Sequence, residues 1–399
     1  MFEVVSSLEV LVSSAALRFT DRLFYSEGYN AFCLCRALAK KGIGLTILAP
    51  SVDVSTSIKG ATIVPMGKFE TVQKMRYYSY NWLKYNLRML TKSKRIIKDI
   101  DPDLIHHIFP SWIDFGYSLF PIFNSTKPFV YGPILTQRGV DMKRASSPKD
   151  RLLSYFRRSL LSKVYEQTLR RATRVIVSVD DALDHLPHFV REKSVTICHG
   201  VDTKFFAPRV SRKDDSRFNV VFLGRWIPPK GIPVAIKAIS LVKHRIPNIL
   251  FKIYGSGPQR AELEVQIKAE GLDGSVQFPG FVEDENLPAA LCEADVLCCP
   301  SLEDASPSVI LQGMACGVPI IATKVGGIPE MVSHGENGLL VEPNDPKALS
   351  EALMRLFGYP EAMREMGKNG RARAERVYDW GVIAQKISEV YEVSIRERR

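Results

Sequence analysis

The chain has 399 residues, of which 46% are hydrophobic and 24% are charged. This length and composition are typical of a globular protein with two domains of roughly 150–200 residues each. The sequence contains no run of about 18 apolar residues, so we expect no transmembrane helix. The N-terminal residues lack a basic stretch, and Glu3 and Glu9 interrupt their apolar pattern, which argues against a signal peptide.

The seven cysteines lie mostly within predicted strands or helices and form no paired Cys-x-x-Cys motifs. We therefore expect reduced, buried thiols in a cytoplasmic protein, and no metal site. The adjacent pair His106-His107 is only weak support for a metal site.

The formal net charge is +11, and the positive excess is concentrated in the first half of the chain. Between Lys68 and Lys98, Glu70 is the only acidic residue. Four large side chains of this stretch share a helical spacing, namely Tyr78, Trp82, Tyr85 and Met89. Two interpretations stay open: a basic aromatic helix on an anionic membrane surface, or a core helix with a solvated basic rim. No recognised nucleic-acid-binding motif accompanies the charge, so we predict no nucleic-acid partner.

The first half of the chain alternates predicted strands with predicted helices. Residues 8–15 and 45–49 have the apolar runs of strands, and residues 30–41 have the pattern of a helix that ends at Gly42. This alternation predicts a parallel sheet. Gly28 precedes the helix, where a glycine either turns the chain or lets the backbone approach a ligand.

Further strands are predicted at residues 104–109 and 129–133. The first contains His106 and His107, and the second contains Tyr131. A histidine near the end of a strand either supports the fold or faces a ligand, and the sequence leaves both interpretations open.

Residues 209–217 are polar and lack apolar periodicity, so we interpret them as a linker. The apolar strand at residues 219–223 then leads into a loop that carries Arg225 and Lys230. Parallel α/β sheets bind ligands at the carboxyl ends of their strands, which is where this loop should lie. Arginine can bind a diphosphate through two hydrogen bonds, and lysine adds a point charge. The simpler alternative is that both are surface residues.

The most specific chemistry lies between Leu297 and Glu330. Strands are predicted at residues 296–299 and 320–323, with a helix at 309–316 between them. The loop before the helix carries Asp304 and Ser306, which can accept hydrogen bonds from sugar hydroxyls, while the helix N-terminus can bind an anion. These two side chains could instead simply cap the helix.

Several motifs resemble those of the retaining glycosyltransferases of family 4. The stretch from Pro300 to Glu330 is similar to the family pattern PSxxE, EAMACGxPV and GGxxE, but Asp304 replaces the first Glu and Gln312 the second. HGVDTKFFAP, which starts at His199, resembles the family's NGVDxxxFxP. The resemblance is dense from Asn219 to about residue 391 and sparse before Pro208.

The resemblance implies an α/β protein of the GT-B fold, in which two Rossmann-like βαβ domains face each other across a cleft. Residues 1–208 would form an N-terminal acceptor-binding domain, and residues 209–377 a domain that binds the nucleotide sugar. Residues 378–399 would form a C-terminal helix that packs back on the N-terminal domain.

The implied reaction transfers a sugar from a nucleotide diphosphate sugar to an acceptor hydroxyl, with retained configuration and without a metal or cofactor. Arg225 and Lys230 would hold the diphosphate, Asp304 would lie near the transferred sugar, and Gln312 would contact the ribose. The further donor-binding positions that match the family are Gly28, Gly224, Gly280, Phe281, Ser306, Pro307, Ser308 and Val309. Residues expected near the acceptor or the sugar are His106, His107 and Tyr131, the last at a place where many relatives carry a histidine.

The expected partners are a nucleotide sugar donor and a glycan or lipid-linked acceptor. A lipid-linked acceptor would bring a cytoplasmic enzyme to the inner face of the cell membrane, where the basic first half could contact anionic lipid. Because Asp304 and Gln312 depart from the family pattern, a catalytically weakened subunit that only binds sugar nucleotides stays open as an alternative. A sugar-nucleotide epimerase of the same architecture lacks support from these motifs.

Overall fold

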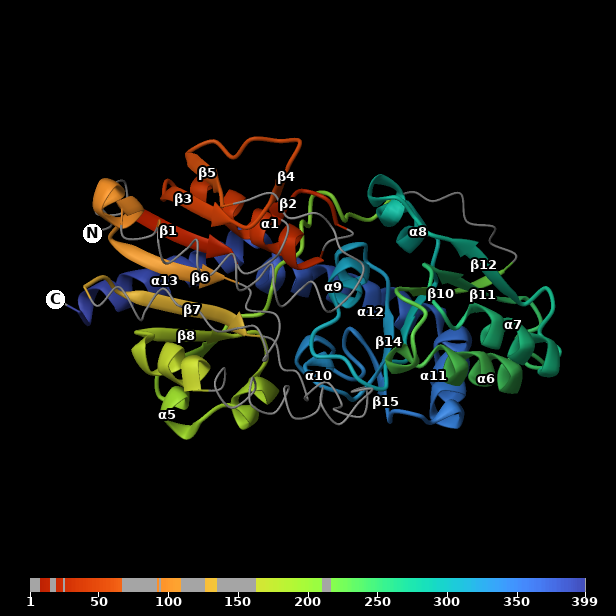
Figure 1. Ribbon diagram of the computed structural model, residues 1–399. Coiled ribbons are helices and arrows are strands. Elements are labelled where there is room, and N and C mark those ends of the chain that lie inside the picture. Colours follow the sequence, from red (N-terminus) through yellow and green to blue (C-terminus); the bar gives the residue numbers. More distant parts are fainter. Residues whose placement is uncertain are drawn as a thin grey trace, which may run out of the picture. The chain divides into compact units, whose positions relative to one another are not determined.

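A computed structural model describes residues 8–14, 19–23, 26–66, 92, 95–108, 126–134, 163–209 and 217–398. The chain divides into two compact units, one made of Met1–His199 and Trp380–Arg399 and the other of Gly200–Asp379. Each unit contains a parallel β-sheet with helices packed on it (Figure 1). This topology confirms the predicted fold class of two Rossmann-like domains.

The sheet of the first unit has the strand order β5-β3-β1-β6-β7-β8-β9, and all of its pairings are parallel. In chain order its strands are β1 (Glu9–Ser14), β3 (Gly44–Ala49), β5 (Ala61–Pro65), β6 (Leu104–Ile108), β7 (Phe129–Ile134), β8 (Arg174–Val177) and β9 (Ser194–Thr196). A separate two-stranded pair joins β2 (Phe19–Thr20) to β4 (Val52–Asp53). The strands predicted at residues 8–15, 45–49 and 104–109 are therefore confirmed within one or two residues.

Both faces of this sheet are buried, because successive side chains of a strand point to opposite sides. Val10 and Val12 pack on one face against α1 (Ser26–Lys40) and α13 (Trp380–Arg396). Leu11, between them, packs on the other face with Leu169 and Val190, the latter in α5 (His188–Arg191). This two-sided burial explains why the strands are almost continuously apolar.

Helix α1 begins at Ser26 and not at Asn30, where the sequence placed its start. Gly28 therefore lies in the first turn of a helix and not in a loop before it. Glycine costs roughly 0.5–1 kcal/mol relative to alanine in the middle of a helix because of its conformational freedom, and Gly28 lies at the end of the helix and not in its middle. Whether Gly28 contacts a ligand stays a prediction.

The last long helix, α13, belongs to the first unit. The Tyr391 hydroxyl lies 2.7 Å from Nδ1 of the buried His106, and the Lys41 ammonium donates to Gln385 at 2.6 Å. Arg174 and Glu397 form an ion pair near the end of the helix. The chain thus leaves the first unit after His199 and returns to it at Trp380.

The sheet of the second unit has the order β12-β11-β10-β13-β14-β15 and is also parallel throughout. Its strands are β10 (Phe218–Leu223), β11 (Ile249–Tyr254), β12 (Val276–Gly280), β13 (Val296–Cys299), β14 (Ile320–Thr323) and β15 (Gly338–Val341). Its α-helices are α6 (Ile232–Val242), α7 (Arg260–Ala269), α8 (Leu287–Cys292), α9 (Ser308–Ala315), α10 (Ile328–Met331), α11 (Pro346–Gly358) and α12 (Pro360–Arg373). The strands predicted at 296–299 and 320–323 are confirmed exactly as predicted, and the helix at 309–316 within one residue.

The helices of the second unit lie on both faces of its sheet (Figure 1). Helices α6, α7 and α11 share one apolar cluster with alternate residues of β10, including Val220 and Phe222. Helix α9 packs on the opposite face, where a Cβ added at Gly313 would lie 2.5 Å from Leu297 of β13. Because all strands of this sheet are parallel, the loops that follow β10, β11, β13 and β14 all lie at its carboxyl edge.

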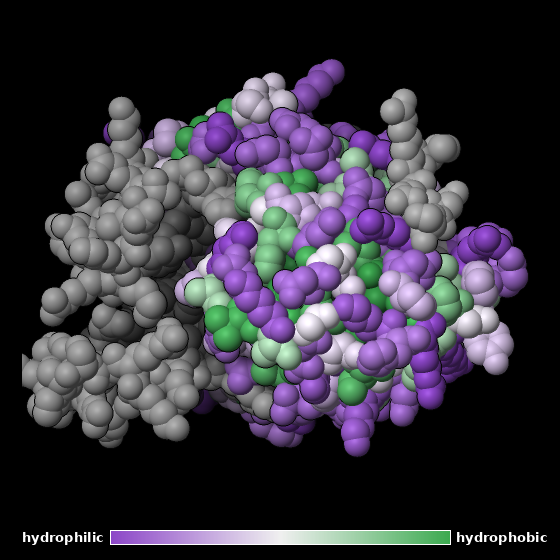
Figure 2. All heavy atoms as spheres, turned by 90° about the vertical axis from the view of Figure 1, so that its right-hand side faces the viewer, coloured by the Kyte–Doolittle hydropathy of each residue, from purple (hydrophilic) through white to green (hydrophobic). Residues whose placement is uncertain are grey.

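No helix in the described part of the chain is long and apolar enough to span a membrane. The basic aromatic stretch from Lys68 to Lys98 falls almost entirely outside the described residues, so its two interpretations stay open. Figure 2 shows a face on which hydrophilic side chains predominate and hydrophobic ones lie scattered among them. All seven thiols are free, and six of them are buried.

The buried histidine pair of β6 should make the stability of the protein depend on pH. Burial lowers the pKa of both His106 and His107 to about 3. An unfolded histidine titrates near 6.5, so the unfolded chain binds more protons than the folded chain between these values. The free energy of unfolding should therefore fall as the pH drops from about 6.5 towards 3, by up to about 1.4 kcal/mol per pH unit for each histidine.

Urea unfolding of the parent and of His107→Gln at several pH values measures this effect. We expect the variant to lose stability less steeply below about pH 6.5, since one buried group no longer titrates. The exposed His244 supplies the matched control, and His244→Gln should keep the parental slope. Equal slopes for all three proteins would contradict the prediction.

Candidate functional site

Two loops meet at the carboxyl edge of the second sheet and bring opposite charges together. The Lys230 ammonium, after β10, forms an ion pair with the Asp304 carboxylate, after β13. The Ser301 hydroxyl lies 3.4 Å from the same carboxylate oxygen. Both charged side chains are largely buried, with 21% of Lys230 and 14% of Asp304 exposed. The sequence placed these two residues in one site, and the structure brings them into direct contact.

Backbone contacts hold these loops at a fixed separation. The N–H groups of Leu302 and Glu303 donate to the Pro229 carbonyl at 2.8 and 3.2 Å. Gly231 has a φ of +66°, and a Cβ there would lie 1.9 Å from the Pro300 carbonyl oxygen. Only glycine permits both this conformation and this close approach.

A third loop, after β14, closes on the same segment. Gly326 has a φ of +49°, and a Cβ there would lie 2.1 Å from the Asp304 carbonyl oxygen. The Gly327 N–H donates to the Ala305 carbonyl at 2.8 Å. This close approach at Gly326 helps to fix the backbone that carries Asp304.

Arg225 stands on the first of these loops and is exposed. Among the residues that the structure describes, its side chain has no hydrogen-bond or ion-pair partner. Its backbone is nevertheless fixed, since the N–H of the preceding Gly224 donates to the Tyr254 carbonyl at 3.2 Å and that of the following Trp226 to Ser256 at 2.9 Å. The site therefore offers one anchored cation at Lys230 and one uncommitted cation at Arg225.

Helix α9 starts directly after the Asp304 loop, with Pro307 at its N-cap position and Ser308 as its first residue. Proline has no side-chain acceptor, so the N-cap residue itself makes no side-chain cap. The first turn contains no acidic residue. Val309 and Gln312 in this helix are partly exposed, as is Ser306 just before it. The positive end of the helix dipole thus lies beside Asp304, where an anion would be favoured.

The thiol nearest to this charge cluster is not a nucleophile. Burial, and then the charge of Asp304, raise the pKa of Cys299 to about 11. The thiol therefore stays protonated near neutral pH, and a thiol is a much weaker nucleophile than a thiolate. The site offers cations, one carboxylate and backbone N–H groups instead, a set suited to binding an anion.

Two further predicted donor-binding residues, Gly280 and Phe281, lie at the carboxyl end of β12. Gly280 has a φ of +92°, and its carbonyl accepts from the Gly255 N–H at 2.8 Å. Phe281 follows it and is 50% exposed, which is unusual for a phenylalanine. The role of both positions in donor binding stays a prediction.

Sequence reasoning missed an aromatic and cationic cluster in this region. Trp226 is buried, and its ring centroid lies 5.0 Å from that of Phe278. The Arg260 guanidinium stands 5.5 Å from the first ring and 4.9 Å from the second. These residues come from three different loops or elements, so only the tryptophan directly after Arg225 could have signalled the cluster.

The predicted acceptor-side residues lie in the first unit and are all buried. Both ring nitrogens of His106 are engaged, with the Tyr391 hydroxyl at 2.7 Å and the Gly132 carbonyl at 3.0 Å. These contacts support the structural interpretation of His106. His107 stacks on Tyr131 with ring centroids 5.6 Å apart, and its Nδ1 lies 3.1 Å from the Ser13 hydroxyl.

His107 and Tyr131 each keep one unused polar atom. Within the described ranges, neither Nε2 of His107 nor the Tyr131 hydroxyl has a hydrogen-bond partner. Burial raises the pKa of Tyr131 well above its usual value, so its hydroxyl stays protonated and can donate a hydrogen bond. These two atoms are the ones of the predicted trio that could contact a ligand, and that role stays a prediction. The same ranges contain no cluster of three or more His, Cys, Asp or Glu side chains that could hold a metal ion.

Two curated relatives share part of this chain. The MMP alpha-(1->4)-mannosyltransferase of Mycolicibacterium hassiacum is 30% identical over 67% of this chain and 64% of its own length. The phosphatidyl-myo-inositol mannosyltransferase of Mycobacterium leprae is 33% identical over 48% of this chain and 51% of its own length. The chain therefore spans less than two thirds of either relative.

One solved structure and two protein-family models match most of the chain. The structure of HepE from Anabaena in complex with UDP matches 97% of this chain and 100% of its own, with a TM-score of 0.66 and 19% identity, which confirms the predicted class of fold. The model of the family described as Glycosyltransferase Family 4 matches residues 31–205, and the model of the family described as Glycosyl transferases group 1 matches residues 203–373. The chain belongs to the group 1 glycosyl transferases of glycosyltransferase family 4.

Proposed function

We propose that the protein transfers a sugar from a nucleotide diphosphate sugar to an acceptor hydroxyl, with retention of the anomeric configuration and without a metal ion. The observation that carries this proposal is the meeting of Arg225, the Lys230–Asp304 ion pair and the N-terminal end of α9 at one sheet edge. Family membership supports the reaction class, and the UDP bound to HepE supports a nucleoside diphosphate as the leaving group.

The charges of the site suit a departing diphosphate. As the bond between the sugar C1 and the phosphate oxygen breaks, negative charge grows on the phosphate. Lys230, Arg225 and the N–H groups of α9 can stabilise that charge where it develops, which preorganised cations and dipoles do well. The acceptor oxygen then bonds to C1 on the same face, and its proton passes to the leaving phosphate, so no protein nucleophile is needed.

Asp304 has two successive roles in this proposal. Before the donor binds, its carboxylate neutralises Lys230. When the diphosphate binds, the ammonium turns to the phosphate and the carboxylate becomes available to the hydroxyls of the transferred sugar. Gln312, one turn into α9, would accept a hydrogen bond from the ribose, more weakly than a glutamate because it carries no charge.

We propose that the acceptor is a glycan or a lipid-linked glycan and that the enzyme works in the cytoplasm, at the inner face of the membrane where its acceptor is lipid-linked. The name of the Mycobacterium leprae relative describes transfer to a phosphatidyl-inositol lipid. The basic first half of the chain fits the same setting, because positive charge is attracted to anionic headgroups.

Removal of either cation should abolish most donor turnover. We expect Arg225→Ala and Lys230→Ala to lower the release of nucleoside diphosphate by roughly 10²- to 10³-fold, the usual effect of losing one group that stabilises the transition state. The assay incubates each protein with a panel of nucleotide sugars, with and without cell-envelope extract. Lys237→Ala removes an exposed lysine of α6 that pairs with Glu270 and should leave the rate unchanged.

Parental rates in both cation variants would refute the assigned site. Donor binding by the parent without transfer or hydrolysis would instead favour the catalytically weakened subunit as the function. In that case Asp304→Glu combined with Gln312→Glu, which restores the family residues, is the variant in which turnover should appear.

A neutral residue at position 304 should separate binding from transfer. In Asp304→Asn, the largely buried Lys230 is left unpaired until a phosphate binds. UDP or GDP should therefore bind at least about fivefold more tightly, since even an exposed ion pair is worth up to about 1 kcal/mol. Sugar transfer should fall, because the charged acceptor for the sugar hydroxyls is gone. Isothermal titration calorimetry and initial rates measure the two effects, and weaker nucleotide binding by the variant would contradict the two-role assignment.

The membrane part of the proposal is tested by flotation with liposomes. We expect the protein to float with vesicles that contain anionic lipid at low salt and to dissociate at high salt, because the attraction is electrostatic and screened by ions. Vesicles of neutral lipid provide the control. Absence of flotation with anionic vesicles at low salt would exclude this contact without affecting the proposed reaction.

A further inference from the structure

Helix α12 and the helical turn that follows it, up to Tyr378, contact the C-terminal ends of α9 and α10. Both of these helices begin beside the proposed donor site. Arg371, at the end of α12, donates to the Ala315 carbonyl at the end of α9 at 2.6 Å. Arg373 and Tyr378 donate to the Glu330 carbonyl in α10 at 2.8 and 3.2 Å. The N-termini of α9 and α10 face the site, and these hydrogen bonds hold their C-terminal ends.

Helix α12 packs closely against the C-terminal end of α9, and the two backbones are in direct contact at Gly367. A Cβ added at Gly367 would lie 2.2 Å from the Gly317 carbonyl oxygen. One turn further along, a Cβ at Gly370 would lie 3.5 Å from the Met314 side chain. Because packed backbones leave no compressible layer, a shift of α12 must move the end of α9 with it.

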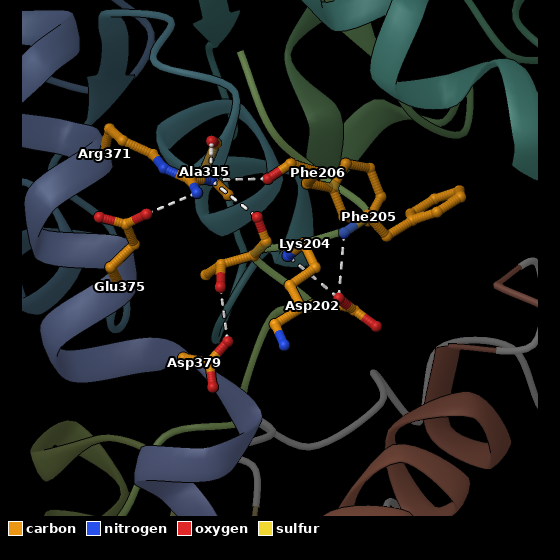
Figure 3. A network of polar contacts seen from close by, with 9 residues as sticks. Asp202, Lys204, Phe205, Phe206, Ala315, Arg371, Glu375 and Asp379 are labelled. Atoms are coloured by element: carbon orange, nitrogen blue, oxygen red, sulfur yellow. Dashed lines mark hydrogen bonds and ion pairs between the residues drawn. The ribbon is translucent and has the colours of Figure 1, made fainter.

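The guanidinium of Arg371 joins three separate parts of the unit (Figure 3). In addition to Ala315, its Nη1 lies 2.9 Å from the Thr203 carbonyl oxygen and 2.8 Å from that of Phe206. Glu375, one turn later, pairs with the other nitrogen at 2.5 Å. Three carbonyl oxygens that point to one place would repel each other, and a charged, planar donor offsets that repulsion.

The turn that contains Thr203 is itself anchored where the chain enters and leaves the unit. The Asp202 carboxylate accepts from the N–H groups of Lys204 and Phe205 at 3.1 and 3.0 Å (Figure 3). The Thr203 hydroxyl donates to the Asp379 carboxylate at 2.6 Å. Arg371 therefore ties α9 to a rigid support and not to a loose loop.

We propose that Arg371 is a positioning residue for the donor diphosphate, an inference that rests on the proposed function. By fixing the C-terminal end of α9, it sets the place of Ser308 and Val309 at the other end. The helix has 8 residues, or about 12 Å at 1.5 Å per residue, so it moves as one rigid piece. A misplacement of the anion-binding turn by even 1 Å is enough to weaken binding and turnover greatly.

The test compares four variants with the parent by titration with UDP and GDP and by donor and acceptor KM. Arg371→Met should lower nucleoside diphosphate affinity about tenfold and raise the donor KM but not the acceptor KM, and Arg371→Lys should restore part of the loss. Arg364→Met removes an exposed arginine from the same helix and should change neither value. Leu353→Ala destabilises the core of α11, on the opposite face of the sheet, and should lower the Tm without altering affinity.

Measurements are made well below the Tm of every variant, so that a general loss of stability cannot imitate the effect. Arg371→Met with the same affinity as Leu353→Ala would overturn the inference while the proposed function stands. A parent that binds neither UDP nor GDP would overturn the proposed function itself and the inference with it. If Arg371→Met does not fold, Arg371→Lys decides. The lysine ammonium ends about one bond short of the Nη1 position and leaves no second nitrogen for Glu375, so parental affinity would refute the role.

Discussion

The ion pair between Lys230 and Asp304 joins two loops that are 74 residues apart in the sequence. Both side chains are mostly withdrawn from water, so either charge would be costly to leave without a partner. The pair can form because Gly231 has no side chain, so its backbone can lie directly against the carbonyl of Pro300 in the other loop. Each of the two charges therefore has its counter-charge within the protein, and the arrangement of the surrounding loops depends on this contact.

The parallel sheet explains why these loops converge. Strands such as β10 and β13 are buried on both faces, so they hold apolar residues and leave charged chemistry to the loops at their carboxyl ends. Stability and reactivity are thus divided between the strands and their ends. The first unit differs, because His107 and Tyr131 lie within β6 and β7 themselves and are buried.

Strands and the helix nearest the site could be predicted from the sequence, because apolar runs bounded by glycine and proline fix their limits locally. The start of α1 could not, since Gly28 is acceptable both in a loop and in a first helical turn. Arg371 could not be singled out for a different reason: apart from Glu375, its partners are backbone carbonyls, one of them 168 residues away, and the sequence does not show which carbonyls a side chain will meet. For His106, the contacts of its two ring nitrogens with Tyr391 and with the Gly132 carbonyl favour a structural role over a functional one, and neither contact can be read from the sequence.

The return of the chain to the first unit at Trp380 has a consequence for the order of folding during synthesis. Residues 200–379 form a continuous unit whose two ends meet where the Val201 N–H donates to the Tyr378 carbonyl at 2.8 Å. That unit can close as soon as its own residues have left the ribosome. The core of the first unit includes Ile383, Ile387 and Tyr391, so of the two units the one whose synthesis begins earlier is the one whose core is completed later.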